Sequence, residues 1–389
     1  MLAERVRKIA PSATLAIDAK AKQLKKEGKD IVIFGAGEPD FNTPENIKKA
    51  ALKSIDDNIT RYTPVGGMPE LKKAAAEKFK RYNNINYDIS EILISCGGKH
   101  SLFNIMMAVL DKGDEAILPV PYWVSYEEMI KLAEAKIVLC GTDEKFKLTS
   151  KIVGEKITDK TKMLILNTPN NPTGAVVDPD EMKKIAELAV DNNFYVVSDE
   201  VYEFFIYGNE RHLSIASLND KIKNLTISVN SVSKTYAMTG WRIGYCGASN
   251  EIIKAMENLQ SHSTSNPSNI AQMAALEALN GPQDSVKEMV RAFDERRKFM
   301  HKRLNEIDGI SCIEPEGAFY VFPDIRETGM KSLEFTSRLL DEALVAVVPG
   351  IAFGSDNNVR LSYATSMHEI EKGLDKIEKW LKQTTVKIH

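Results

Sequence analysis

Short apolar runs alternate with longer amphipathic stretches through the middle of the chain. The apolar runs predict strands at residues 91–95, 115–119, 136–140, 162–167, 194–199, 225–230 and 241–247. Helical patterns lie between most of them, for example from Ser101 to Leu110 and from Glu181 to Val190. Because the strands are rich in Ile, Leu and Val on both faces and are joined by helices, we expect an α/β fold. Its mostly parallel sheet should be covered by helices on both faces.

The pattern changes near residue 250. Helical stretches fill 250–305, and a further helix is predicted near 332–343, followed by the strand-like segments 343–348 and 359–364. The final segment, His368 to Lys382, predicts a helix with one apolar face made of Ile370, Leu374, Ile377 and Leu381. We therefore expect a smaller α+β domain built from both chain ends. The predicted boundaries are 1–45 for its N-terminal part, 46–285 for the large domain and 286–389 for its C-terminal part.

Composition and charge narrow the class of protein. Of 389 residues, 43% are apolar and 27% are charged, which is typical of globular proteins and excludes a wholly disordered, collagen-like or coiled-coil chain. Lys and Arg number 51 against 54 Asp and Glu, a formal charge of −3. Since there is no basic excess and no basic block, we expect no nucleic-acid partner.

The cysteines and the N-terminus bear on the compartment. Cys96, Cys140, Cys246 and Cys312 lie far apart and form no C-x-x-C pair, so zinc-ribbon and thioredoxin-like sites are excluded, and such sparse use suits a reducing compartment. The N-terminus is charged and lacks the apolar core of a signal peptide. No window approaches about 18 uninterrupted apolar residues, so no membrane span is expected. We expect a cytoplasmic protein.

Lys234 is the first candidate for chemistry. It stands just beyond the strand at 225–230, in the segment SVSKTYAMTGWRIGY. In a doubly wound sheet, ligands bind at the carboxyl ends of the strands, where a desolvated lysine becomes nucleophilic toward a carbonyl. The alternative is an ordinary surface lysine. Arg242, eight residues on, could hold a phosphate through bidentate hydrogen bonds.

Other strand ends carry polar residues. The loop NTPNNPTG (167–174) is either a tight turn or a way to aim an asparagine amide at a ligand. Asp199 ends the next apolar run and precedes Tyr202; it is either a helix N-cap or a site carboxylate. In SCGGKHSLFN, the backbone N–H groups of Gly98, Lys99 and His100 could hold an anion at a helix N-terminus.

Two further features complete the inventory. PYWVSY (121–126) offers aromatic rings for stacking on a flat ligand or for ordinary packing, and Arg360 lies in an apolar run where a substrate carboxylate would suit it. Together these residues supply an amine, a phosphate cradle, a ring sandwich, a carboxylate and a guanidinium. That set matches a site for pyridoxal phosphate.

The chain resembles the fold-type I, class I/II aminotransferases, and most closely the thermophile-type bacterial and archaeal aspartate aminotransferases. The resemblance runs from about Ser12 to the last helix. It rests on these motifs: AGEPDFNTP (36–44), RYTPVGGMPEL (61–71), GGK (97–99), PYWVSY, NNPTG, SDEVYE, SxSK with TGWRIGY, GAFYVFP (317–323), PG with FG (349–354), and VRLSYATS.

The resemblance implies a role for each matching residue. Lys234 should form an imine with the cofactor aldehyde and move the substrate proton. Asp199 should pair with the pyridine nitrogen, Asn171 and Tyr202 should bind the phenolic oxygen, and Trp123 should stack on the ring. The remaining cofactor residues should surround the phosphate: Gly98, Lys99, Ser231, Arg242 and, from the neighbouring subunit of a homodimer with shared sites, Tyr62.

Substrate contacts are also implied by the resemblance. Arg360 and the Gly37 backbone should bind the α-carboxylate, with Trp123 and Asn171 beside the substrate. Lys99 should hold the distal carboxylate, or else serve only the phosphate loop. Ping-pong transamination between aspartate and 2-oxoglutarate is favoured. Aromatic amino acids, prephenate, alanine and a β-lyase reaction stay open.

Rival classes match the sequence less well. Gly35-Ala36-Gly37 lacks the third glycine of a dinucleotide fingerprint, because Pro39 and Asp40 follow. Ser231 to Lys234 fits S-x-x-K and residues 355–357 fit S-D-N, but no K-T-G accompanies them. A related transcription regulator would carry a DNA-binding domain ahead of this pattern. The histidines are scattered without ligand spacing, so no metal site is expected.

Overall fold

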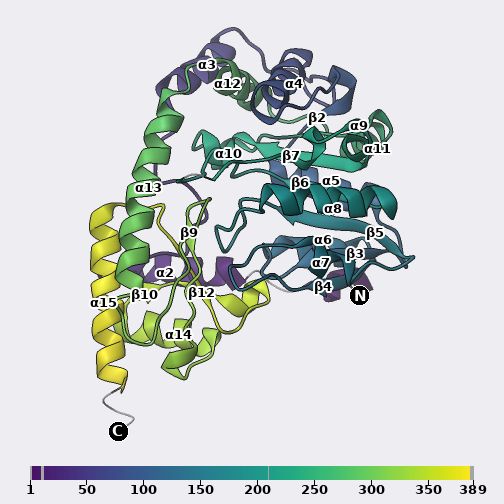
Figure 1. Cartoon of the computed structure of the whole chain (residues 1–389). Coiled ribbons are helices and arrows are strands. Elements are labelled where there is room, and N and C mark those ends of the chain that lie inside the picture. Colours follow the sequence, from purple (N-terminus) through teal and green to yellow (C-terminus); the bar gives the residue numbers. More distant parts are fainter. Residues whose placement is uncertain (1, 10–12, 209, 386–389) are drawn as a thin grey trace.

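The computed structural model describes residues 2–9, 13–208 and 210–385 (Figure 1). The helices are α1 (Glu4–Arg7), α2 (Ala13–Lys26), α3 (Glu45–Asp56), α4 (Pro69–Asn83), α5 (Gly98–Val109), α6 (Ser125–Leu132), α7 (Ser150–Gly154), α8 (Pro179–Asp191), α9 (Asp220–Leu225), α10 (Val232–Thr235), α11 (Asn250–Ser261), α12 (Asn269–Asn280), α13 (Asp284–Leu304), α14 (Ser332–Ala343) and α15 (Met367–Thr385).

The strands are β1 (Val32–Ile33), β2 (Ile92–Ser95), β3 (Glu115–Pro119), β4 (Lys136–Cys140), β5 (Thr161–Asn167), β6 (Tyr195–Asp199), β7 (Thr226–Ser231), β8 (Gly244–Gly247), β9 (Tyr320–Val321), β10 (Val345–Ala346), β11 (Val348–Pro349) and β12 (Val359–Ser362). Short 3₁₀ turns are η1 (Ile89–Glu91), η2 (Ile215–Ser217), η3 (Thr239–Trp241), η4 (Arg326–Thr328) and η5 (Gly350–Phe353).

The central sheet has the order β2-β8-β7-β6-β5-β3-β4. Strand β8 runs antiparallel to both its neighbours, and the pairs from β7 through β4 are parallel. Each predicted apolar run contributes one of these strands. The expected mostly parallel α/β sheet is therefore confirmed.

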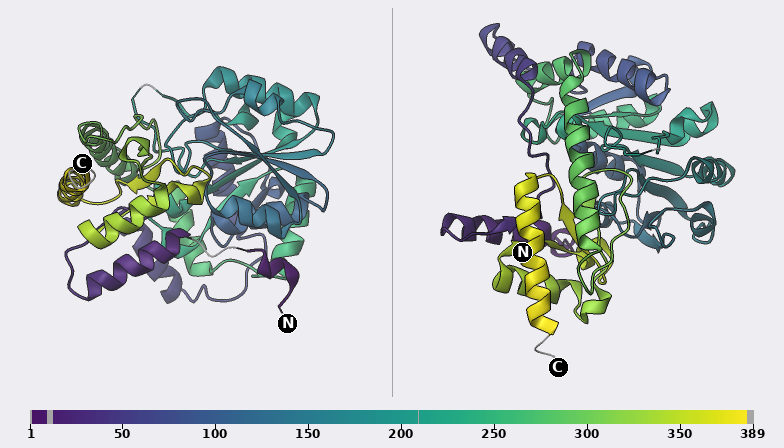
Figure 2. Two further views of the ribbon diagram at one scale, coloured as in Figure 1. Left: turned by 90° about the horizontal axis from the view of Figure 1, so that it is seen from below. Right: turned by 60° about the vertical axis from the view of Figure 1, so that its left-hand side comes forward.

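Helices cover both faces of this sheet (Figure 2). Ala116 and Leu118 of β3 point to the layer formed by α5, α6 and α11. Ile117, between them, points to the layer formed by α7, α8 and α9. This alternation explains why the strands are apolar at nearly every position: period-two side chains face two cores.

A second unit packs beside the large sheet. Strands β11, β12 and β9 form an antiparallel sheet, and β1 pairs in parallel with β10. The long helices α13 and α15 lie side by side along this unit (Figure 1). The predicted apolar face of the last helix is buried at all its positions: Ile370, Leu374, Ile377 and Leu381.

The pairing of β1 with β10 brings the two ends of the chain together, as expected for a domain built from both. The boundaries near residues 45 and 285 stay a prediction. Ser12, where the family resemblance starts, and the last residues from 386 lie outside the described residues. Within the described part of the chain, no helix has both the length and the apolar character needed to cross a bilayer.

Two predicted strands are wrong in detail. The run 343–348 is not one strand, because Val345–Ala346 pairs with β1 while Val348–Pro349 pairs with β12. The run 241–247 becomes a strand only from Gly244, since Thr239–Trp241 forms a 3₁₀ turn and Arg242 adopts a left-handed φ of 58°.

Strand register decides where the functional side chains lie. Asn167 at the end of β5 pairs with Asp199 at the end of β6, and Asp199 pairs with Val229 of β7. The carboxyl ends of three parallel strands therefore meet at one edge of the sheet. Ligands of doubly wound folds bind at such an edge.

Candidate active site

A cavity of about 690 Å³ opens at this edge, between the large sheet and the second unit. It gathers nearly all of the site residues predicted from the sequence: Gly37, Gly98, Lys99, Trp123, Asn171, Asp199, Tyr202, Ser231, Lys234, Arg242 and Arg360. Tyr62 is the exception. Its side chain is 92% exposed, and it does not line this cavity.

Lys234 lies on the short helix α10, directly after β7. Its ammonium donates a hydrogen bond to the backbone carbonyl of Gly37. Desolvation lowers the pKa of Lys234 to about 8; the positive charges of Arg360 and Arg242 act in the same direction, and Glu38 opposes them. A lysine with such a pKa has a substantial free-amine population near neutral pH and can attack a carbonyl.

Asp199 is buried at the end of β6. Its Oδ2 accepts a hydrogen bond of 2.6 Å from Tyr126 Oη, and its Oδ1 accepts one of 3.3 Å from the Val201 N–H. Desolvation raises the pKa of Asp199 to about 6, against the effect of these hydrogen bonds. Both donors are neutral, so the carboxylate would gain most from a cationic partner in the cavity, such as a protonated ring nitrogen.

Asn171 and Tyr202 are both buried, and each contacts a polar group of the second unit. Asn171 Oδ1 accepts a hydrogen bond of 3.0 Å from Arg360 Nη1, and the Tyr202 hydroxyl lies 2.9 Å from that of Tyr320. Trp123 packs edge-on against Tyr126 with ring centroids 5.3 Å apart and lines the cavity with its indole. These side chains offer polar atoms and an aromatic surface to a flat ligand.

The opposite end of the cavity is positively charged. The start of α5 presents the backbone N–H groups of Gly98 and Lys99 near Arg242, whose Nη1 donates to the Thr239 carbonyl at 2.8 Å, whereas the His100 N–H already donates to the Gly97 carbonyl at 2.9 Å. Lys99 is exposed along the cavity, its ammonium 4.9 Å from the Trp123 ring, and desolvation followed by the charge of Arg242 lowers its pKa. Two cations and a helix N-terminus at one spot suit a phosphate.

Glycines make this close approach possible. Gly97 has a φ of 91°, and a Cβ there would lie 2.4 Å from Arg242 Nη2. A Cβ on Gly244 would lie 2.3 Å from the Gly98 nitrogen. A larger residue at Gly244 would collide with the backbone at the start of α5, and one at Gly97 would displace the Arg242 guanidinium.

Arg360 is 3% exposed on β12. Its Nη2 donates to the Gly35 carbonyl at 2.9 Å, while its Nε has no hydrogen-bond partner among the described residues. Desolvation lowers the pKa of Arg360. No acidic side chain of the described chain forms an ion pair with this guanidinium. A buried arginine in this condition is well suited to binding a ligand carboxylate.

Sequence reasoning missed three residues of the site. Tyr126 holds Asp199, Tyr320 holds Tyr202, and Glu38 accepts a hydrogen bond of 2.7 Å from Thr239 while lining the cavity. All three lie inside motifs that the sequence analysis singled out: PYWVSY, GAFYVFP and AGEPDFNTP. The period-two and turn signals in those motifs do not distinguish a site tyrosine from a packed one.

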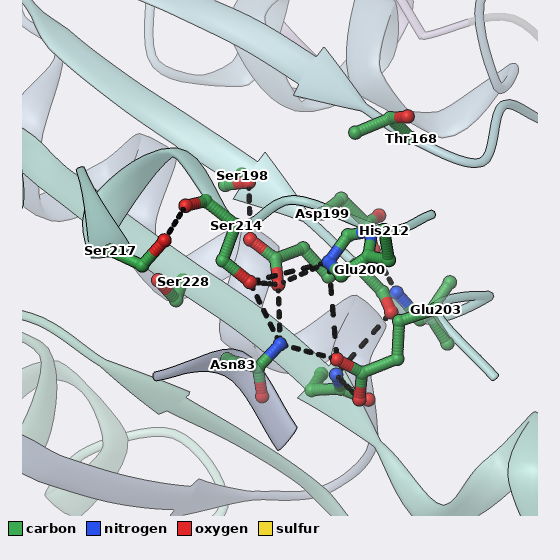
Figure 3. A network of polar contacts seen from close by, with 12 residues as sticks. Asn83, Thr168, Ser198, Asp199, Glu200, Glu203, His212, Ser214, Ser217 and Ser228 are labelled. Carbon is green, nitrogen blue, oxygen red and sulfur yellow. Dashed lines mark hydrogen bonds and ion pairs between the residues drawn. The ribbon is translucent and has the colours of Figure 1, made fainter. Parts of the chain in front are cut away.

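A buried polar network lies behind Asp199 (Figure 3). His212 Nε2 lies 2.9 Å from Glu200 Oε2, and Lys78 forms an ion pair with Glu203. Although desolvation opposes it, the charge of Glu200 raises the pKa of His212. Asn230 donates to Glu203 at 2.7 Å and accepts from the Ser231 N–H at 2.8 Å, which connects the network to the cavity.

The same network contains a group with metal-like spacing, although the sequence predicts no metal site. Ligand atoms of Glu200, Glu203 and His212 lie within 4.8 Å of one another. Their carboxylate oxygens already accept hydrogen bonds or ion pairs from Asn83, Ser198, Ser214, Asn230, His212 and Lys78. The carboxylates of this group therefore already have partners within the protein, and His212 Nδ1 alone in the group has no hydrogen-bond partner among the described residues.

The cavity residues fit pyridoxal phosphate. The lining combines a lysine of lowered pKa, a buried carboxylate that would gain from a cation, the aromatic ring of Trp123 and the cations Lys99 and Arg242. The chemistry of this donor set matches an aldehyde, a protonated pyridine, a planar ring and a phosphate.

Comparisons with known proteins agree with this fit. Residues 29–377 match the family model for aminotransferase class I and II. An aspartate aminotransferase of Bacillus sp. (strain YM-2) is 48% identical, over 98% of this chain and 99% of that protein. A probable aspartate/prephenate aminotransferase of Aquifex aeolicus is 46% identical, over 98% and 99%. The solved aspartate aminotransferase of Thermus thermophilus with maleate superposes with a TM-score of 0.94 at 42% identity, covering 97% of this chain and 99% of that one.

Proposed function

Since the chain belongs to the class I and II aminotransferases, enzymes that depend on pyridoxal phosphate, we propose that it transfers the amino group of aspartate to 2-oxoglutarate by a ping-pong mechanism. Two features of the cavity carry this proposal. Neither Arg360 nor Lys99 forms an ion pair with an acidic side chain in the described part of the chain, and both line the cavity. A dicarboxylate substrate supplies one carboxylate to each.

The bound cofactor supplies an electron-accepting ring that stabilises negative charge developing at the substrate Cα. Lys234 takes the Cα proton, because desolvation keeps part of its amine unprotonated near neutral pH. Asp199 keeps the ring nitrogen protonated, since its carboxylate meets only neutral donors in the protein. Asn171 and Tyr202 hold the phenolic oxygen, and Trp123 stacks on the ring.

Phosphate binding falls to the positively charged end of the cavity. The N–H groups of Gly98 and Lys99, the Ser231 hydroxyl and the Arg242 guanidinium surround the phosphate. Gly37 and Arg360 bind the α-carboxylate of the substrate, which fixes its Cα in front of Lys234. Closure of the second unit over the bound carboxylate would exclude water, which strengthens the ion pair with Arg360.

A second candidate is transamination of prephenate. The support is the aspartate/prephenate name of the Aquifex relative. Aromatic amino acids, alanine and a β-lyase reaction are further outcomes that the same cavity could serve. Alanine and the aromatic amino acids lack the distal carboxylate with which aspartate would bind Lys99.

We also propose a homodimer with shared sites in the cytoplasm. The proposal is supported by Tyr62, which is 92% exposed and does not line the cavity of its own chain. Leu52 and Ile55 on α3 leave apolar side chains exposed, at 61% and 48%. Sedimentation measures the mass directly. Mixing Tyr62→Ala with Lys234→Ala protein should restore a fraction of the activity, because one site of each mixed dimer keeps both residues.

The decisive experiment is an absorbance scan of the protein with bound cofactor, before and after L-aspartate is added without an acceptor. Loss of the pyridoxal phosphate band with growth of the pyridoxamine phosphate band is the expected result. A band that ignores aspartate but responds to alanine or an aromatic amino acid would reassign the amino donor; prephenate, an oxo acid without an amino group, can react only with the pyridoxamine phosphate form. No band in the wild type would overturn the proposed function, and an unchanged band in Lys234→Ala would overturn the assignment of Lys234.

A further inference from the structure

We propose that Tyr320 is a positioning residue that joins the two halves of the active site, its ring supporting Arg360 and its hydroxyl supporting Tyr202. This inference deepens the proposed function and rests on the roles proposed for Arg360 and Tyr202. Tyr320 touches neither cofactor nor substrate in this scheme; it acts through the two residues that do.

Tyr320 stands where the two halves meet. It begins β9, pairs with Ser362 of β12 in antiparallel register and has no exposed surface. A Cβ on Gly37 would lie 3.4 Å from its hydroxyl oxygen. The hydroxyl is therefore next to the backbone that accepts the hydrogen bond from Lys234.

The ring of Tyr320 supports Arg360. The guanidinium carbon lies 4.5 Å from the Tyr320 ring centroid and 5.1 Å from that of Phe353. Its polar partners, Asn171 Oδ1 and the Gly35 carbonyl, are uncharged. Because this buried cation meets no acidic side chain of the described residues, the aromatic faces provide its only electron-rich surroundings apart from those dipoles. Such contacts strengthen when the cation is desolvated.

The hydroxyl of Tyr320 supports Tyr202 at an oxygen–oxygen distance of 2.9 Å. If Tyr202 donates its proton to the phenolic oxygen of the cofactor, it accepts one from Tyr320. A hydroxyl that accepts a hydrogen bond becomes a stronger donor itself. Tyr320 therefore stabilises the more anionic form of the bound cofactor, and losing its hydroxyl should raise the apparent pKa at which that cofactor titrates.

Four charged groups from other elements lie near the pair. Arg360 from β12, Asp199 from β6 and Glu38 from the segment between β1 and α3 act on its hydroxyls, and Lys234 from α10 donates to the Gly37 carbonyl beside Tyr320. The Tyr320→Phe substitution leaves all four groups in place. A change in the cofactor titration would then report the missing hydroxyl.

The test compares Tyr320→Phe and Tyr320→Leu with Tyr363→Phe. The control loses a buried hydroxyl in the same unit, one that donates to the Ala318 carbonyl at 3.1 Å. Two quantities are measured on the protein with bound cofactor: the apparent pKa of its absorbance change with pH, and the dissociation constant of maleate, an unreactive dicarboxylate. Thermal unfolding checks that each variant is folded, and Tyr320→Met replaces the leucine variant if that one does not fold.

Tyr320→Phe should raise the apparent pKa by about 0.5 to 1 unit and keep maleate affinity within about twofold, because the ring remains. Tyr320→Leu should weaken maleate about tenfold, the loss expected for one desolvated cation–π contact. Tyr363→Phe should change neither. A Tyr320→Phe variant that titrates like the wild type, or a leucine variant that binds maleate normally, overturns the inference. If the wild type itself shows no cofactor band, the proposed function fails instead.

Discussion

The proposed contact between Lys99 and a distal carboxylate predicts a preference for acidic amino acids over uncharged ones. The ammonium lies 4.9 Å from the Trp123 ring, and its pKa is lowered first by desolvation and then by the charge of Arg242. Both effects destabilise the charged ammonium of Lys99, so a negatively charged ligand beside it would be favourable. Lys99→Met removes the charge and keeps an unbranched stem against the indole.

The size of the effect follows from the exposure of Lys99. An exposed ion pair contributes up to about 1 kcal/mol, and a hydrogen bond to a charged group about 1.5–3 kcal/mol. Lys99 borders open solvent in the free protein, so the lower part of this combined range applies. We expect kcat/KM for aspartate to fall about tenfold and that for alanine to change by less than about twofold.

Steady-state kinetics with aspartate and alanine measures this difference, with Lys223→Met as the matched control. Lys223, like Lys99, places its ammonium 4.9 Å from an aromatic ring, here that of Tyr87, but lies outside the cavity. Equal losses for aspartate and alanine, together with a higher dissociation constant for pyridoxal phosphate, would refute the distal-carboxylate role and assign Lys99 to the phosphate.

Three further predictions test the cofactor site. Asp199→Asn should slow the aspartate half-reaction about 100-fold while the cofactor still binds, because a neutral amide cannot hold the ring nitrogen protonated; stopped-flow absorbance checks this, and an unchanged rate contradicts it. The rate at which apoprotein combines with pyridoxal phosphate should rise with pH with a midpoint of about 8, since only unprotonated Lys234 attacks; a midpoint near the ordinary lysine pKa of 10.5 would be inconsistent with desolvation. Gly97→Ala should weaken cofactor binding at least about tenfold by displacing Arg242. Gly113→Ala, with a φ of 101° and no atom within 4 Å of the added Cβ, controls for backbone strain in fluorescence titrations, and equal affinities in the two variants would exclude the clash.

Much of the large domain could be predicted because its strands are apolar on both faces. The runs at 115–119 and 136–140 coincide with β3 and β4 to the residue. The run at 343–348 was predicted wrongly, because apolar character alone does not say which partner each half of a segment pairs with. The run at 241–247 failed at its start, because Arg242 adopts a left-handed backbone that places its guanidinium beside Gly97.

The site was predictable where a residue type has few other uses. A lysine after a buried strand, an aspartate at the end of another and an arginine within an apolar run each carry a desolvation cost that a ligand can offset. Tyr126 and Tyr320 carry no such signal, because a tyrosine in an apolar motif is ordinary core. Their roles depend on the residues that their hydroxyl groups contact, Asp199 and Tyr202, which lie 73 and 118 residues away in the chain.

The pairing of β1 with β10 also orders events during synthesis. Strand β1 leads directly into Gly35 and Gly37, the wall that contacts Arg360 and Lys234. Its partner strand emerges from the ribosome roughly 300 residues later, about 15–60 s at ordinary elongation rates. Once β8 has been made, at Gly247, the nascent chain has every strand of the large sheet but still lacks β10, the partner of β1. We therefore expect a chain that stops short of residue 345 to lack the proposed carboxylate site, because Arg360 lies later still, on β12.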